Sequence, residues 1–188
     1  AEEKIKLGMK ILIREGSAAK NFDALIPLID KYPDMIMFSS DDKHPDDLIA
    51  GHINLLVSKA VKSGYNLYNV LRAATINPIE HYKLETGSLR IGDSADFAIV
   101  DNLTDFNIIE TYIKGEKVYS NGKSLINTEM QAPVNKFVAS EKSVNDFAVA
   151  AQSENIRVIK AIDGELITEE LICKAKVIEN HIVSDLSR

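Results

Sequence analysis

The sequence predicts an α/β protein in which two parallel β/α units precede a smaller β-rich unit. Two short apolar runs, residues 8–13 and 35–40, predict buried strands, and each is followed by apolar residues at helical spacing. Strands that alternate with helices are typical of a parallel sheet. After residue 84, glycines separate short β-rich runs, which indicates a change to an antiparallel architecture.

The first predicted helix follows Asn21, whose side chain can cap a helix start. Its apolar face comprises Leu25, Ile26, Leu28 and Ile29. A second helix is expected from Pro45, a residue favoured at the first helical position, with Asp46 and Asp47 in the positive first turn. We expect this helix to continue without a break and to bury Ile49, Ile53, Leu56, Val57 and Ala60.

Gly64 is predicted to end that helix, and Asn66 to cap a third one. Asn77-Pro78 then ends the third helix and starts a short helical turn. Strands are expected over 95–100, 108–113 and 117–119, with hairpin turns at Gly115-Glu116 and Asn121-Gly122.

The last part of the sequence begins with a polar stretch, residues 127–145, which we expect to be a linker. A short helix over 146–152, a hairpin that turns at Asp163-Gly164 and a final strand over 176–183 should follow. Only two β/α units are present and a closed barrel needs eight, so we expect the chain to be a fragment of a longer protein.

Composition and charge argue against several classes of protein. The net charge of −6 disfavours a nucleic-acid partner. No apolar run approaches the length of a membrane span, and the start of the sequence has no signal peptide. The single cysteine, Cys173, cannot form an internal disulfide, which favours a reducing compartment, and we therefore expect a cytoplasmic protein.

Acidic residues follow the second predicted strand. Asp41 and Asp42 come directly after it, and the carboxyl ends of strands are where barrels and open α/β sheets place their chemistry. A carboxylate partly removed from water can bind a proton tightly enough to act as a base near neutral pH. Helix capping is the alternative function of these acids.

Three polar residues, Arg14, Glu15 and Ser17, follow the first predicted strand, at the same end of the sheet. They predict a substrate-facing loop, or alternatively an Arg–Glu pair that closes the loop around Gly16. His44 could contact a substrate or lie at the surface. The four histidines have no metal-ligand spacing, and the sequence contains neither His-x-His nor Pro-Cys-x-x-Cys.

Several short sequence motifs together resemble those of a known protein family. Residues 40–48 (Ser-Asp-Asp-Lys-His-Pro-Asp-Asp-Leu) with Gly51-His52, and residues 13–19 (Ile-Arg-Glu-Gly-Ser-Ala-Ala), resemble the last two barrel strands of the adenine deaminases. Residues 73–78 and 87–101 are similar to the exit from the barrel throughout the metal-dependent amidohydrolase superfamily, to which the adenine deaminases belong.

The resemblance implies a fold. Residues 1–83 would be the last two β/α units of a (β/α)8 amidohydrolase barrel, residues 84–132 a small β-sandwich-like unit, and residues 133–188 a partial α+β segment that starts a C-terminal domain.

The resemblance also implies an activity. The full enzyme would hydrolyse the purine base adenine to hypoxanthine and ammonia at a binuclear manganese or iron site. Asp41 would be the last metal ligand and the catalytic base, with Asp42 as the close competitor. Arg14, Glu15, Ser17 and His44 would bind the substrate. We expect a homo-oligomer, and we expect this part alone to be inactive and to bind no metal, since the other ligands are missing.

Three alternatives stay open. The chain could belong to another amidohydrolase that acts on cyclic amides, such as a dihydroorotase-like or deacetylase-like enzyme. It could be a non-catalytic structural module. An acidic cation site at Asp41, Asp42, Asp46 and Asp47 is disfavoured, because the spacing does not match the ligand pattern of such loops.

Overall fold

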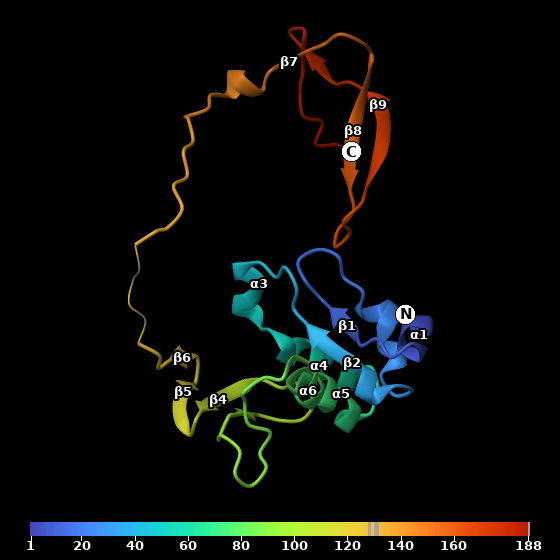
Figure 1. The fold of residues 1–188 in the computed structure, drawn as a ribbon. Coiled ribbons are helices and arrows are strands. Elements are labelled where there is room, and N and C mark those ends of the chain that lie inside the picture. The colour runs from blue at the N-terminus through green and yellow to red at the C-terminus, as the bar shows by residue number, and fades with distance from the viewer. Residues whose placement is uncertain (128, 130–131, 188) are drawn as a thin grey trace. The chain divides into compact units, whose positions relative to one another are not determined.

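The computed structural model describes residues 1–127, 129 and 132–187 and divides into two compact units, Ala1–Thr128 and Glu129–Arg188. Figure 1 shows that the first unit holds the helices and a pair of short parallel strands, whereas the second contains antiparallel strands after a stretch whose described residues form no helix or strand. No helix in the described part of the chain has the length and apolar character needed to cross a membrane.

The centre of the first unit is a parallel pair, β1 (Ile11–Arg14) and β2 (Ile36–Ser39). Ile11 lies opposite Ile36 and Arg14 opposite Ser39, so both strands end at the same edge. The connection contains α2 (Phe22–Leu25) and the 3-10 turns Ile26–Leu28 and Pro33–Met35, which confirms the predicted strand–helix–strand order. A short helix that we did not predict, α1 (Glu2–Lys6), precedes β1.

Three helices, α4 (Ile53–Lys62), α5 (Leu67–Ala74) and α6 (Ile76–Tyr82), follow the strands in the chain. The Asn66 side chain accepts hydrogen bonds from two backbone N–H groups of α5, which confirms the predicted cap. The helices and strands share one apolar core that includes Ile13, Phe22, Ile29, Ile36, Leu56, Val57, Ala60, Val70 and Ala73.

The predicted continuous helix from Pro45 is wrong, because it breaks between α3 (Pro45–Ala50) and α4. Gly51 has φ +148°, a conformation that residues with a side chain rarely adopt. A Cβ atom at this position would also lie 2.6 Å from Cγ of Leu55. Because the break reorients α3, Ile49 is 89% exposed rather than part of the core.

Asn77 is fully buried in α6 and joins this helix to β2. Its amide nitrogen donates hydrogen bonds to the carbonyl oxygens of Pro33 (2.6 Å) and Ile36 (2.7 Å). The sequence indicated only a helix boundary here. Both carbonyls would otherwise lack these donors in the interior, so the Asn77 side chain is a structural requirement.

An antiparallel sheet in the order β3 (Phe97–Val100), β4 (Ile108–Ile113), β5 (Glu116–Ser120), β6 (Lys123–Ser124) completes the first unit. The predicted turn at Asn121-Gly122 is confirmed. The other turn lies one residue earlier than predicted, at Lys114-Gly115, since both residues have the positive φ that a two-residue hairpin turn of this kind requires.

Asp96, the residue directly before β3, binds two other backbone segments through its side chain. Its carboxylate accepts backbone N–H hydrogen bonds from Lys114 and Gly87, each at 2.7 Å. Both bonds stabilise the charged carboxylate and so lower the pKa of Asp96 to about 2. The bond from Lys114 has the larger effect, followed by the bond from Gly87.

The second unit contains a long hairpin, β8 (Asn155–Ala161) with β9 (Thr168–Lys174), which confirms the hairpin predicted around Asp163-Gly164. A small sheet combines β7 (Val149–Ala150), β10 (Val177–Ile178) and β11 (His181–Ile182).

Two predictions for the second unit are wrong. The strand predicted over 176–183 is split, because Glu179 and Asn180 form a turn with positive φ. The helix predicted over 146–152 is instead a 3-10 turn, Val144–Phe147, followed by β7. The predicted linker 127–145 includes residues 128, 130 and 131, and the predicted C-terminal segment includes residue 188; these four lie outside the described residues.

We predict that Asn77→Ala lowers the free energy of unfolding by about 2 kcal/mol, because it removes a part-buried hydrogen bond to the carbonyl of Pro33 and a buried one to the carbonyl of Ile36. Urea unfolding of the 188-residue chain would measure the loss. Glu80→Ala is the matched control, since Glu80 is exposed on the same helix and makes no hydrogen bond or ion pair with a described residue. Equal stability of the two variants would contradict the role of Asn77.

We predict a pH-dependent effect for Asp96→Asn. The folded-state pKa lies below the ordinary value of 3.8, so the stabilisation is complete above pH 3.8 and is lost as the pH falls toward 2. The variant should therefore be less stable than the wild type at pH 7, and the difference should shrink between pH 4 and pH 2. Thermal unfolding across this pH range, with Glu80→Gln as control, measures the difference in stability between variant and wild type. A difference that does not change with pH would refute the prediction.

Candidate functional site

An ion pair joins the ends of the two parallel strands. Arg14 is the last residue of β1, and Asp41 follows β2 by two residues. Nη1 of Arg14 donates to Oδ2 of Asp41 at 2.6 Å, and the two side chains are 38% and 36% exposed. Two residues 27 positions apart in the sequence thus meet at one sheet edge, as the strand order predicts.

The backbone of Asp41 lies in the left-handed region, with φ +50°. Aspartate tolerates this conformation better than most residues, but it remains uncommon outside glycine. The N–H of Asp41 donates to the hydroxyl of Ser39 at 3.2 Å, which helps to hold the turn. Such unfavourable conformations persist where surrounding contacts fix them, and they cluster at functional sites.

The next residue, Asp42, lies directly against the loop that follows β1. A Cβ atom at Gly16 would be 2.0 Å from Oδ1 of Asp42, which is far inside van der Waals contact. The absence of a side chain at position 16 therefore allows the two loops to meet. The backbone N–H of Glu15 also donates to the carbonyl of Ser39 at 3.3 Å.

Ser17 connects the first loop to the start of α3. Its hydroxyl donates to Oδ2 of Asp47 at 2.6 Å and accepts from the backbone N–H of His44 at 2.9 Å. His44 is the residue that precedes α3, its side chain makes no capping hydrogen bond, and the residue is exposed. Asp46 and Asp47 both lie in the first turn, as predicted.

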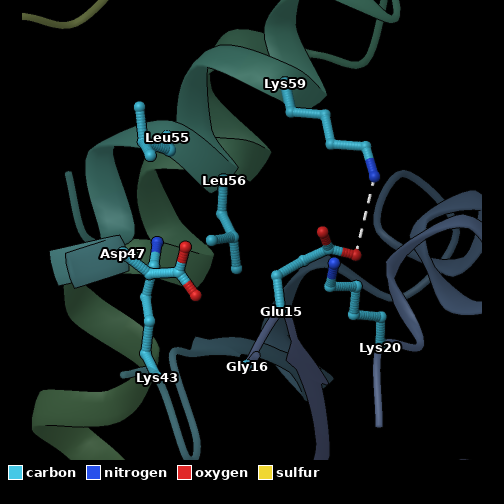
Figure 2. Close-up of a pocket in the computed structure, with 8 residues that line it drawn as sticks. All are labelled: Glu15, Gly16, Lys20, Lys43, Asp47, Leu55, Leu56 and Lys59. Atoms are coloured by element: carbon cyan, nitrogen blue, oxygen red, sulfur yellow. Dashed lines mark ion pairs between the residues drawn. The ribbon is translucent and has the colours of Figure 1, made fainter. Parts of the chain in front are cut away.

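A cavity of about 180 Å³ lies beside these loops, lined by Glu15, Gly16, Lys20, Lys43, Asp47, Leu55, Leu56 and Lys59. Figure 2 shows the carboxylate of Glu15 directed toward the amine of Lys59, 3.5 Å away. Arg14 pairs with Asp41 and Glu15 with Lys59, so the expected alternative of an Arg14–Glu15 pair is not formed. The volume is below the roughly 300 Å³ at which ligand pockets usually begin.

Lys59 is a residue of this site that the sequence did not reveal. Besides Glu15, its amine contacts a carboxylate oxygen of Asp23 at 3.2 Å and lies 4.1 Å from the ring centre of Phe22. Its partners come from the loop directly after β1 and from α2, and that arrangement depends on the tertiary fold.

His52 was also missed. His52 lies in the break before α4, and its Nε2 is 2.8 Å from the hydroxyl of Ser40. An imidazole is thereby linked to the residue before Asp41. Only the conformation of Gly51 brings it there, and a periodic apolar pattern gives no signal of such a break.

The described residues do not by themselves fit a metal centre. They contain no group of three or more histidine, cysteine, aspartate or glutamate side chains close enough to hold an ion. A carboxylate such as that of Asp41 is a suitable donor for divalent metals, but its partner within this chain is the guanidinium of Arg14.

The sequence of this chain is similar to a known protein family. The sequence profile of the Amidohydrolase family matches residues 3–118. The proteins named adenine deaminase from Methanosarcina barkeri and Salinibacter ruber are 48% identical to this chain, and the one from Borreliella burgdorferi is 46% identical. Each match covers 100% of this chain. The chain spans about a third of the length of these relatives, 34–36%.

Among solved structures, the β-aspartyl dipeptidase of Fervidobacterium islandicum AW-1 is similar, with a TM-score of 0.55 and 26% identity. The similarity covers 69% of this chain and 38% of the dipeptidase. The matched profile includes both loops of the site and most of the first unit. This chain is therefore a member of the amidohydrolase family.

Proposed function

We propose that this chain is part of an adenine deaminase, an enzyme that hydrolyses adenine to hypoxanthine and ammonia. The observation that carries the proposal is the identity of 46–48% to proteins of that name along the whole chain. The activity is proposed for the whole protein, because the chain corresponds to about a third of those relatives.

The fold that we propose for the whole protein is a (β/α)8 barrel with added units. Residues 1–83 would supply the last two β/α units, which agrees with the parallel pairing of β1 and β2. Residues 84–132 would form the small β-sandwich unit, and the four-stranded antiparallel sheet supports this. Residues 133–188 would start the C-terminal domain.

In the proposed mechanism, Asp41 is the catalytic base. Its carboxylate would take a proton from the attacking water and pass it to a ring nitrogen or to the departing amine. The position at the carboxyl edge of β2, the partial exposure and the left-handed backbone all support this role. Asp42 is the second candidate, although its carboxylate faces the backbone at Gly16.

Membership of the amidohydrolase family implies a metal-dependent enzyme. We propose a binuclear manganese or iron site with Asp41 as one ligand. The other ligands would have to come from elsewhere in the whole protein, because the described residues contain no group of three or more side chains that could hold an ion. A bound metal would lower the pKa of water so that hydroxide forms near neutral pH.

We propose that Arg14, Glu15, Ser17 and His44 border the substrate. They lie at the end of β1 and on the two loops that follow β1 and β2. Their contacts to Asp41 and Asp47 join these loops, and the contact to Lys59 joins the first loop to α4. The small cavity beside them would be one part of a larger pocket.

We also propose a cytoplasmic homo-oligomer. The free thiol of Cys173 supports a reducing compartment. In the described residues β1 and β2 form a sheet of two strands, and their outer edges would pair with other strands of the proposed barrel.

A second candidate activity is hydrolysis of a β-aspartyl dipeptide, which is favoured by the structural similarity to an enzyme that cleaves such substrates. The identity to that enzyme is about half of the identity to the proteins named adenine deaminase.

A substrate panel tests the proposed function. The full-length protein, loaded with Mn²⁺ or Fe²⁺, should release ammonia from adenine and should not hydrolyse β-Asp-Leu, dihydroorotate, hydantoin or an N-acetyl sugar. The typical efficiency of enzymes predicts kcat/KM above about 10⁴ M⁻¹s⁻¹ for the true substrate. Turnover of one of the other compounds, with none of adenine, would refute the proposal.

Asp41→Asn should lower kcat on adenine by about 10²- to 10⁴-fold, because the amide cannot accept the proton. Asp42→Asn should lower it by less than about tenfold, since this carboxylate is assigned no proton transfer. Asp46→Asn is the matched control, an exposed acid on the same segment without a partner among the described residues. Steady-state kinetics and the metal content of each variant test this prediction. A larger loss of kcat in Asp42→Asn than in Asp41→Asn would make Asp42 the base.

A further inference from the structure

We infer that Ser17 and Asp47 form a clamp that positions the loop carrying Asp41. This inference rests on the proposed function only in naming the reaction that the loop serves. The clamp is the hydrogen bond from the Ser17 hydroxyl to Asp47 (2.6 Å), together with the bond from the His44 N–H to the same hydroxyl (2.9 Å).

The hydroxyl of Ser17 is committed to these two contacts. Its only proton goes to the Asp47 carboxylate, and one of its lone pairs accepts from His44. A hydrogen bond to a charged acceptor at this short distance belongs to the stronger class. Ser17 therefore contributes to the proposed substrate site chiefly by fixing its loop, and a contact to substrate through its hydroxyl proton would require breaking the clamp.

The clamp acts on Asp41 because it fixes the far end of a short segment. At one end, Asp41 is held by Arg14 and by the hydroxyl of Ser39. Three residues later, the N–H of His44 is held by Ser17. At the first of these points the backbone of Asp41 adopts the uncommon left-handed conformation, which persists only where surrounding contacts hold it.

Gly16 allows Ser17 to contact the start of α3. Because position 16 has no side chain, the carboxylate of Asp42 can approach the first loop, and Ser17 is then beside the start of α3. The partners of Ser17 are 27 and 30 residues away in the sequence, so the contact is entirely tertiary.

The helix dipole alone does not account for Asp47. Asp46 lies in the same first turn and would complement the dipole equally well, yet it makes no hydrogen bond or ion pair with any residue that the structure describes. The two neighbouring acids therefore form a natural pair for an experiment, one inside the clamp and one outside it.

Kinetics of the full-length, metal-loaded protein test the clamp. Ser17→Ala and Asp47→Ala should each lower kcat by about 10- to 100-fold while KM changes by less than about twofold, because a misplaced catalytic group slows the chemical step. The double variant should be within about threefold of Ser17→Ala, since Ser17→Ala already removes both the bond to Asp47 and the bond from His44. Ser17→Thr and Asp47→Asn keep a donor and an acceptor and should restore most of the activity, and Asp46→Ala should behave as the wild type.

Hydrogen exchange provides a readout that does not depend on activity. In Ser17→Ala, the amides of residues 41–44 should exchange at least about tenfold faster than in the wild type, whereas the amides of α5 should be unchanged. Thermal melting verifies that each variant is folded, and Asp47→Ala, which removes the same Ser17–Asp47 bond, serves where Ser17→Ala does not fold.

The outcomes separate this inference from the proposed function. A protein that does not deaminate adenine refutes the function, and the kinetics are then measured on whichever compound of the panel it hydrolyses. Unchanged exchange over residues 41–44, kcat within about twofold of the wild type for Ser17→Ala and Asp47→Ala, or an equal loss in Asp46→Ala would each overturn the clamp.

Discussion

The parallel pairing of β1 with β2 is the constraint on which the rest of the first unit depends. Parallel strands end at the same edge, so the residues that follow them are brought together whatever their separation in the sequence. The ion pair between Arg14 and Asp41 and the bonds of Ser17 all lie beyond this one edge. A shift of the register by one residue would turn the buried isoleucines of the strands toward the opposite face, so the apolar core fixes the geometry of the site.

Features with a local cause could be predicted from the sequence. Asn66 caps its helix through its own side chain, and Asn121-Gly122 turns a hairpin through its own backbone. The order of strands and helices follows from apolar spacing, and the meeting of the two loops follows from that order. Each of these requires knowledge of only a few neighbouring residues.

Features that depend on distant partners could not be predicted. The spacing of apolar residues from Ile49 to Ala60 fits one helix, and the break at Gly51 overrides that spacing because the backbone there is compatible only with glycine. Asn77 is indistinguishable from a helix-ending asparagine until the carbonyls of Pro33 and Ile36 are seen beside it. The partners of Lys59 and His52 likewise become visible only when the fold is known.

The contact at Gly16 limits how this protein can be engineered. Replacing glycine by alanine often stabilises a fold, since it reduces the freedom of the unfolded chain. At position 16 the added methyl group would overlap the carboxylate of Asp42 and force two loops apart. A thermostable version of this protein would therefore have to leave this glycine in place and gain rigidity in parts of the chain away from the strand ends.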